Sequence, residues 1–535
     1  MMADRNAPAA WRSARTAWHA LLALLLLSLA VHTAAPVTTN DLYWHLATGR
    51  RIVAEGFPAH DAFSYTATEL PWFLHEWLTQ VTFYTLHLGA GFGGLRLATG
   101  LAAAGIGLLV YRLWRREVGS ASGAVLGTVG FLFLAVDRFQ TRPTLFSMAL
   151  VVLLVALLTR RARRWTRAEA AAVVGLTLLW VNLHSVGLLA LPLYGCAALG
   201  VTIARLRGGA TTGDLVRHVG TLALVALATL VTPSGLALWA FALQDKREVM
   251  QFVSDEWAPF DFDWARNESL TFDAYVLVLL GLAVLGVVYV CSAVAIARAR
   301  AQGRLDDVLH PARLGVLALC VALALAARRF HWMLAIAVAL GLGEVRAWRA
   351  AGLLSWPVDG ARLFRVARGG VIGLTLLASV AFYARGLRGE DGRPHEALVA
   401  AHYWRADACR AFDLGGLRFL ADAGLQGNVF CHYGSGGHIT FAAWPKLRVF
   451  IDSRIDLYRR AVYLDWLAIA RGRPDQQALL DRWGTDLYYR HWDMVPPLDA
   501  ASWECVYRGD DGEVYVRNVA DSDRPHTVRA VARPR

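Results

Sequence analysis

The sequence carries little charge for its length. Charged residues make up 18% of its 535 residues, whereas a soluble domain usually has nearer a quarter. Hydrophobic residues make up 56%. Apolar runs close to the roughly twenty residues that cross about 30 Å of hydrocarbon recur along the chain up to about residue 390. A single soluble core does not explain this rhythm, so the composition predicts a polytopic α-helical membrane protein.

Cysteine and metal motifs are also scarce. The six cysteines are scattered and form no Cys-x-x-Cys pair, so no zinc or redox motif follows from them. The stretch His75-Glu76-Trp77-Leu78-Thr79 lacks the second histidine of a zinc-protease helix. Asp261 and Asp263 form an Asp-x-Asp pair whose oxygens suit a divalent cation, but two acids in a solvated loop are common by chance. We therefore expect no cofactor and do not favour a metal.

The apolar runs predict about eleven membrane spans. They lie near residues 17–35, 93–113, 119–136, 143–159, 169–184, 186–204, 216–232, 272–297, 312–327, 330–346 and 369–386. With the N-terminus inside, nearly every arginine cluster falls in an inside connection. Positive-inside topology therefore explains the net charge of +12 better than nucleic-acid binding does. The first run can also be read as a signal peptide cleaved near Ala34, but an uncleaved helix keeps the alternation consistent.

Two regions differ from the spans and define the expected domains. Residues 1–386 form a transmembrane domain whose outer loop, 36–92, carries amphipathic helices, the first lying at the membrane interface and the second running from Glu76 to Leu88. Residues 387–535 alternate strand-like and helix-like stretches and end in a hairpin, which predicts an extracytoplasmic α/β domain.

Two patterns in the C-terminal domain allow a functional and a structural interpretation. Gly434-Ser435-Gly436-Gly437 follows a strand, but it lacks the dinucleotide fingerprint and a P-loop lysine, so a tight turn is favoured over a nucleotide site. Asp452, Arg454 and Asp456 alternate along an extended run. They can face an active-site cleft or form a structural ion pair, and we favour the ion pair.

Several longer stretches resemble bacterial GT-C-type glycosyltransferase-like membrane proteins. They are Asn40-Asp41-Leu42-Tyr43-Trp44-His45-Leu46-Ala47-Thr48-Gly49, Asp61-Ala62-Phe63-Ser64-Tyr65-Thr66, His75-Glu76-Trp77-Leu78, Trp180-Val181-Asn182-Leu183-His184 and Val449-Phe450-Ile451-Asp452-Ser453-Arg454-Ile455-Asp456-Leu457-Tyr458. These pieces come from both ends of the chain, so the resemblance is to the whole architecture. It implies a multi-pass protein of the bacterial inner membrane.

The resemblance also implies a reaction, the transfer of a sugar from a polyprenyl-phosphate donor to an envelope glycolipid, polymer or protein on the outer face. An acidic residue in the first outer loop is expected near the chemistry, and Asp41 occupies that position. Asp41 is a candidate general base, although Asp is also a favoured N-cap for a helix beginning at Leu42. His45, one turn later, and Glu76, beside His75, are the other catalytic candidates.

A lipid-phosphate leaving group needs cationic or hydrogen-bonding partners at the outer boundary. Candidates at the predicted ends of spans are Arg138, Arg142, His184, Arg328, Arg329 and His331. Any one of these arginines can simply extend its side chain to the lipid headgroups, but several on the side where few are expected favour a shared anionic partner. The second long outer segment also carries Asp255 and Glu256 side by side.

Two other classes of protein remain as alternatives to an enzyme. A transporter or flippase would move a glycolipid without making bonds, but the sequence shows no clear internal repeat and the candidate charges gather at one face. A non-catalytic scaffold would use the outer domain to bind envelope polymers.

Overall fold

The computed structural model divides the chain into two units. It describes residues 9–34, 39–68, 70–160, 165–207, 210–243, 255–267, 271–305, 308, 310–355, 369–370, 372–382, 414–454, 456–491, 494–497, 499, 501–509 and 512–518. The helical unit comprises Met1–Ala35, Arg96–Gly235 and Asp255–Ala400. The mixed unit comprises Pro36–Leu95, Leu236–Ser254 and Ala401–Arg535. The predicted domain boundary near residue 387 lies outside the described residues.

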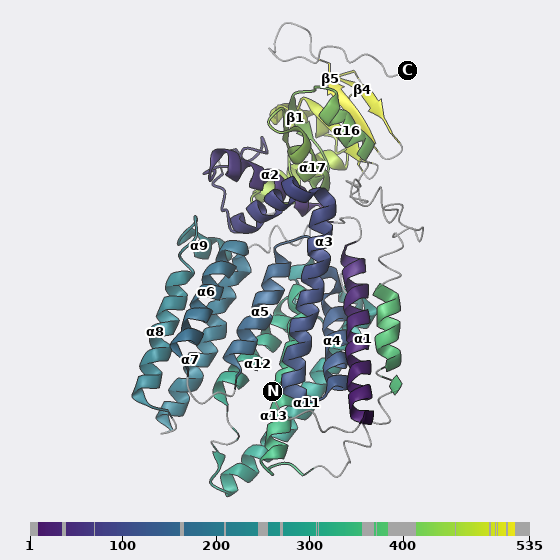
Figure 1. Cartoon of the computed structure of the whole chain (residues 1–535). Coiled ribbons are helices and arrows are strands. Elements are labelled where there is room, and N and C mark those ends of the chain that lie inside the picture. The colour runs from purple at the N-terminus through teal and green to yellow at the C-terminus, as the bar shows by residue number, and fades with distance from the viewer. Residues whose placement is uncertain are drawn as a thin grey trace. The chain divides into compact units, whose positions relative to one another are not determined.

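The helical unit contains a helix at each of the eleven predicted apolar runs (Figure 1). These are α1 (Ala9–Thr33), the part of α3 (Trp77–Val118) from Arg96 onward, α4 (Ala121–Ala135), α5 (Thr144–Leu158), α6 (Arg167–Leu183), α7 (Ala190–Leu206), α8 (Thr212–Ala228), α11 (Phe272–Ala301), α12 (Pro311–Ala326), α13 (Trp332–Ala350) and the helix Ile372–Phe382. Short 3-10 turns lie between them at η1 (Val136–Arg138), η2 (Ser185–Leu189), η3 (Asp255–Trp257), η4 (Trp264–Arg266) and η6 (Arg328–Phe330).

Five of these segments are long and apolar enough to cross a membrane. They are Thr16–Thr33, Trp77–Val118, Ala121–Arg138, Ser185–Leu206 and Phe272–Ala301. Three shorter apolar helices accompany them, at Thr144–Leu158, Pro311–Ala326 and Ile372–Phe382. The membrane character of the chain is confirmed, and the count of eleven spans stays a prediction.

Small residues let the helices of this unit approach closely. A Cβ added at Gly200 of α7 would lie 2.4 Å from the backbone nitrogen of Ala312 in α12, and α12 packs on both α7 and α13. Such close backbone approach is the usual way in which helices associate where lipid removes the hydrophobic driving force between them.

A buried ionic cluster joins the ends of four helices of the helical unit. Arg313 of α12 donates to Glu117 of α3 over 2.6 Å and also pairs with Glu344 of α13 and the carbonyl of Thr159 at the end of α5. The side chains of Arg313, Glu117 and Glu344 are at most 4% exposed. This cluster was not predicted, because the arginines of that end were interpreted only as topology signals.

The mixed unit holds a five-stranded sheet with helices around it. Its helices are α2 (Asp41–Glu55), the start of α3, α9 (Ala237–Leu243), α16 (Leu414–Asp422), α17 (Tyr433–Ala443), α18 (Arg460–Ala470) and α19 (Gln476–Arg482). Its strands are β1 (Gly427–Phe430), β2 (Leu447–Val449), β3 (Leu487–His491), β4 (Trp503–Arg508) and β5 (Gly512–Arg517), in the order β2-β1-β3-β5-β4. β1 is parallel to β2 and β3, while β5 is antiparallel to β3 and β4. The predicted strands and hairpin are therefore present.

Residues of the first loop extend this sheet beyond β2. Ser64 forms a parallel bridge with Val449, the Tyr65 amide donates to the Val449 carbonyl over 3.1 Å and the Val449 amide donates to the Phe63 carbonyl over 3.0 Å. The loop thus covers what would otherwise be an edge strand with unpaired backbone groups. The two ends of the sequence therefore contribute to one folded unit.

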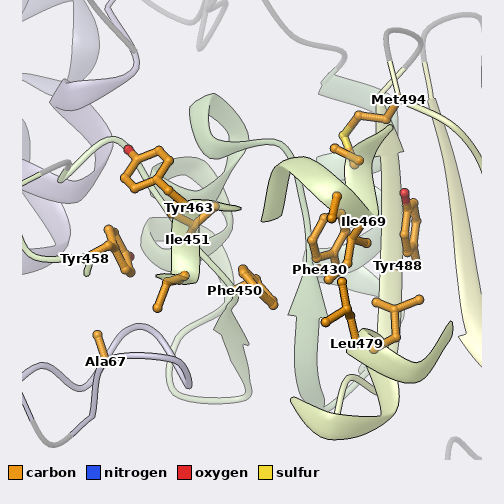
Figure 2. Close-up of a cluster of buried hydrophobic side chains, with 14 of the residues drawn as sticks. Ala67, Phe430, Phe450, Ile451, Tyr458, Tyr463, Ile469, Leu479, Tyr488 and Met494 are labelled. Carbon is orange, nitrogen blue, oxygen red and sulfur yellow. The ribbon is translucent and has the colours of Figure 1, made fainter. Parts of the chain in front are cut away.

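An aromatic core fills one side of the sheet (Figure 2). Phe430, Phe450 and Tyr488 are fully buried in it, and Ala67 of the first loop joins the same cluster. The rings of Phe430 and Tyr488 lie 4.9 Å apart. Rings of this size dominate core energetics because each buries a large apolar area.

Three local predictions for the mixed unit are corrected or refined. Helix α2 is buried at every position from Leu42 to Gly49 and packs on α17, so these turns belong to the protein core rather than to an exposed face, and the position of the helix at the membrane interface stays a prediction. Gly434 to Gly437 lie inside α17 rather than in a tight turn. The predicted helix from Glu76 begins at Trp77 and meets the following span at Gly91, whose φ of 61° breaks the helical path of α3.

Candidate functional site

Asp41 lies in the first turn of α2 rather than capping it. The helix begins at Asp41 itself and Asn40 occupies the N-cap position, so the capping interpretation of Asp41 is wrong. The Asp41 amide donates to Thr39 Oγ1 over 3.3 Å, and Trp44 Nε1 lies 3.5 Å from Asp41 Oδ1. Asp41 is half-buried. An anion at this place is stabilised by the positive end of the helix dipole.

Glu76 lies between two histidines in the same unit. Its Oε2 is 3.7 Å from His45 Nδ1 and its Oε1 is 3.8 Å from His75 Nε2. His45 and Glu76 are both buried, while the ring of His75 stacks on Phe241 at 4.7 Å. His75 Nδ1 lies 2.9 Å from the Phe73 carbonyl, a contact that orients the ring. The structure therefore brings the candidates His45 and Glu76 together.

A second acidic pair in this unit is structural. Arg454 Nη1 donates to Asp61 Oδ1 over 2.6 Å and its Nη2 donates to Asp452 Oδ2 over 2.7 Å. The guanidinium lies over the rings of Trp72 and Phe63, and all three charged side chains are at most 4% exposed. The predicted ion pair is confirmed for Asp452 and Arg454, with Asp61 as the unexpected third member, whereas Asp456 is exposed.

Burial and neighbouring charges act in opposite directions on the pKa values of Asp61 and Arg454. Burial raises the pKa of the Asp61 carboxyl, but the positive charge and hydrogen bond of Arg454, together with bonds from Ser64, outweigh it and hold the pKa below its ordinary value. Burial lowers the pKa of Arg454, and the charges of Asp452 and Asp61 raise it well above the usual range. Asp61 and Arg454 are therefore charged at neutral pH, and their ion pair holds the first loop against the C-terminal part of the unit.

In the helical unit, two arginines lie beside one carboxylate and the charge of a third acts on it. Arg138 of η1 is paired with Glu256 of η3, and Arg329 Nη1 of η6 lies 3.6 Å from Glu256 Oε1. Arg142 is close enough for its charge to act on the same carboxylate. Burial raises the pKa of Glu256, whereas Arg329, Arg138 and Arg142 lower it, to about 2. We call Arg138, Arg142 and Arg329 the arginine cluster.

The other predicted phosphate ligands have different surroundings. Arg328 is buried and its guanidinium donates to the Arg266 carbonyl. His184 Nδ1 lies 2.7 Å from Ser147 Oγ, which also accepts from Trp180 Nε1 over 2.8 Å. The His331 ring packs against Phe260.

The predicted Asp-x-Asp pair is engaged within its own turn. Asp263 Oδ1 accepts from the Ala265 amide over 3.1 Å and Asp261 Oδ1 accepts from the Asp263 amide over 2.9 Å. Arg266 lies 3.6 Å from each carboxylate. In the part of the chain that the structure describes, no group of three or more histidine, cysteine or acidic side chains is arranged to hold a metal ion.

The architecture is similar to that of solved membrane proteins. No protein-family model and no curated protein matches the chain. Among solved structures, the oligosaccharyltransferase of Archaeoglobus fulgidus in its apo form is 11% identical, with a TM-score of 0.51 over 89% of this chain and 69% of its own. ArnT of Cupriavidus metallidurans, bound to undecaprenyl phosphate, is 16% identical, with a TM-score of 0.50 over 97% of this chain and 100% of its own.

The chain has the GT-C fold. The resemblance that the sequence motifs indicated is thus confirmed for the architecture. The GT-C resemblance pointed to Asp41 and the outer arginines. It did not identify Glu256 as the partner of Arg138 and Arg329, because that pairing joins three loops separated by more than seventy residues, and adjacent acids at Asp255 and Glu256 gave no sign of it.

Proposed function

We propose that this protein transfers a sugar from a polyprenyl-phosphate donor to an acceptor of the bacterial envelope, on the outer face of the inner membrane. The arginine cluster carries the proposal, because charged groups gathered in a membrane protein are costly unless they are paired or functional, and planar guanidinium groups match phosphate oxygens. The GT-C fold supports it, since one protein of this fold is seen bound to undecaprenyl phosphate.

The chemistry is a single displacement at the anomeric carbon with inversion. The acceptor oxygen forms a bond to that carbon while the bond from the carbon to the phosphate oxygen breaks. The acceptor proton passes to a carboxylate, for which Asp41 is the candidate base, and the polyprenyl phosphate leaves with one more negative charge. The arginine cluster would stabilise the charge that develops on the departing phosphate.

Glu76 is the rival base, because His45 and His75 lie within 4 Å of its carboxylate. Two variants separate the candidates. Asp41→Asn and Glu76→Gln each preserve shape and remove the negative charge. The base is the residue whose variant loses transfer while still binding the donor and unfolding at the temperature of the parent.

The acceptor class includes lipid A, another glycolipid, a wall polymer and a protein. Mass spectrometry of envelope glycolipids and polymers from cells with and without the protein identifies the product as the species that disappears. Complementation with Arg138→Gln/Arg329→Gln should fail to restore that species, whereas Arg160→Gln, whose side chain is 58% exposed, should restore it. An envelope that is unchanged by loss of the protein would contradict the proposal.

A further inference from the structure

The carboxylate of Glu256 occupies the arginine cluster. It is paired with Arg138 and lies 3.6 Å from Arg329, and the Arg329 guanidinium also lies 4.1 Å over the ring of Trp257. The side chains of Glu256, Arg138 and Arg329 are each only about one-fifth exposed or less. Carboxylate and phosphate oxygens bind guanidinium groups in the same forked geometry, so the two anions are alternatives at one set of donors.

The chain around Glu256 is held by backbone contacts that do not involve its side chain. The Arg328 amide donates to the Ala258 carbonyl over 3.0 Å, and the Phe260 amide donates to the Leu325 carbonyl over 2.9 Å. These bonds fix the segment after η3 against η6 and the end of α12. These backbone contacts do not depend on the Glu256 side chain, so they would remain if that side chain rotated away from the donors.

We propose that Glu256 is a built-in counter-anion that the donor's phosphate displaces and that returns when the polyprenyl phosphate leaves. This rests on the proposed function, because it assigns the arginine cluster to the donor. A displaceable counter-anion explains why the carboxylate of Glu256 lies at a site that is expected to bind the donor's phosphate. Glu256 offsets part of the positive charge of the arginine cluster and competes with the product phosphate for the same donors.

If Glu256 and phosphate compete for the same arginines, Glu256 weakens phosphate binding and favours release of the product. Removing the charge of Glu256 removes the carboxylate that competes with phosphate for Arg138 and Arg329, so phosphate binding should tighten. The product has one more negative charge than the donor, so it should gain more affinity than the donor does. The variant should therefore become sensitive to inhibition by its own product.

The test measures binding of undecaprenyl phosphate to the full chain in lipid nanodiscs. Glu256→Gln should bind it about tenfold more tightly than the parent does. Glu256→Asp, whose side chain is one methylene shorter, should have an affinity between those of Glu256→Gln and the parent. Asp263→Asn removes a carboxylate from the same loop, one whose side chain is 56% exposed, and should leave the affinity unchanged. Unfolding temperatures measured in the same nanodiscs identify any variant that has lost its fold.

The outcomes separate this inference from the proposed function. If Glu256→Gln binds as the parent does, or more weakly, while Arg138→Gln abolishes binding, Glu256 is a positioning residue and the counter-anion inference is overturned with the proposed function intact. If Arg138→Gln/Arg329→Gln binds undecaprenyl phosphate as tightly as the parent does, the cluster is not the phosphate site and both fail. If Glu256→Gln binds undecaprenyl phosphate more tightly than the parent does while Asp263→Asn does not, the result supports both the counter-anion inference and the proposed function.

Discussion

Arg454 and Asp61 are 393 residues apart in sequence, and their side chains meet at 2.6 Å inside the mixed unit. Asp452 completes the triad on the other side of the guanidinium. A buried charge is tolerated only when its partners and hydrogen bonds are complete. The first loop and the C-terminal part of the chain are therefore one cooperative structure, and their stability depends on this contact.

Replacing Arg454 with methionine should destabilise the mixed unit by about 3–5 kcal/mol, because two buried carboxylates would lose their shared partner. The measurement is thermal unfolding of the purified chain followed by tryptophan fluorescence. Adding Asp61→Asn and Asp452→Asn to that variant should recover part of the loss. Arg482→Met, which removes a surface pair in which the arginine side chain is 58% exposed, should cost less than about 1 kcal/mol. Equal losses in both single variants would contradict the role of burial.

The stability of the mixed unit should vary with pH because of His438. Its ring is buried against Tyr43 at 3.7 Å, and burial lowers the pKa of His438 to about 3. The unfolded chain binds this proton near pH 6.5, so stability is lost as the pH falls from about 6.5 toward 3. At pH 5 the loss is about 2 kcal/mol.

The check compares unfolding temperatures at pH 7 and pH 5. His438→Phe should remove most of the difference, and the exposed His60→Gln should retain it. Asp61 does not contribute to the difference between pH 7 and pH 5. Its pKa lies below the ordinary carboxyl value, so its contribution to stability is lost only at lower pH. A difference that survives in His438→Phe would assign the acid sensitivity to another group.

Two glycine positions should respond oppositely to alanine. A Cβ at Gly49 of α2 would lie 2.2 Å from the Gln80 carbonyl oxygen, whereas nothing lies within 4 Å of a Cβ at Gly89. Gly49→Ala should therefore cost about 1–3 kcal/mol through overpacking. Gly89→Ala in α3 should be neutral or stabilising by up to about 1 kcal/mol. Thermal unfolding of both variants checks the pair, and a harmless Gly49→Ala would show that α2 and α3 are less tightly packed.

The ionic cluster of the helical unit should be as sensitive as the Arg454 triad. Arg313→Met leaves Glu117 and Glu344 buried without their common partner, at an expected cost of about 3–5 kcal/mol. Glu117→Gln in the same chain should recover part of that cost. Arg300→Met, at an exposed position of α11, serves as the control for loss of an arginine. The readout is the temperature at which the chain loses its solubility in mild detergent.

The helices of this protein could be predicted from its sequence because their cause is local. A run of apolar residues is helical in a membrane whatever lies beside it, since the backbone must satisfy its own hydrogen bonds. The strands of the mixed unit were found for a similar reason, through short β-branched and aromatic runs between turn residues.

Features that depend on distant partners were missed. Helix α17 begins with three glycines within its first five residues, a poor local signal. The glycines are nevertheless required there, because a Cβ at Gly436 would lie 2.2 Å from the Ile451 carbonyl oxygen and one at Gly437 would lie 3.1 Å from the Asn40 carbonyl oxygen. The contacts of Arg454 with Asp61, of Arg313 with Glu117 and of Arg138 with Glu256 were missed for the same reason, since no local pattern indicates a contact across 118 residues or more.

Because residues 63 to 65 pair with β2, the first loop cannot complete its folding until β2 has been synthesised. Synthesis at about 5–20 residues per second separates Asp61 from Arg454 by roughly 20–80 s. During that interval the first loop has left the ribosome with neither its strand partner nor its counterion. A nascent chain arrested before β2 should therefore expose this segment to proteases or to holding chaperones, and release of the C-terminal residues should end that exposure.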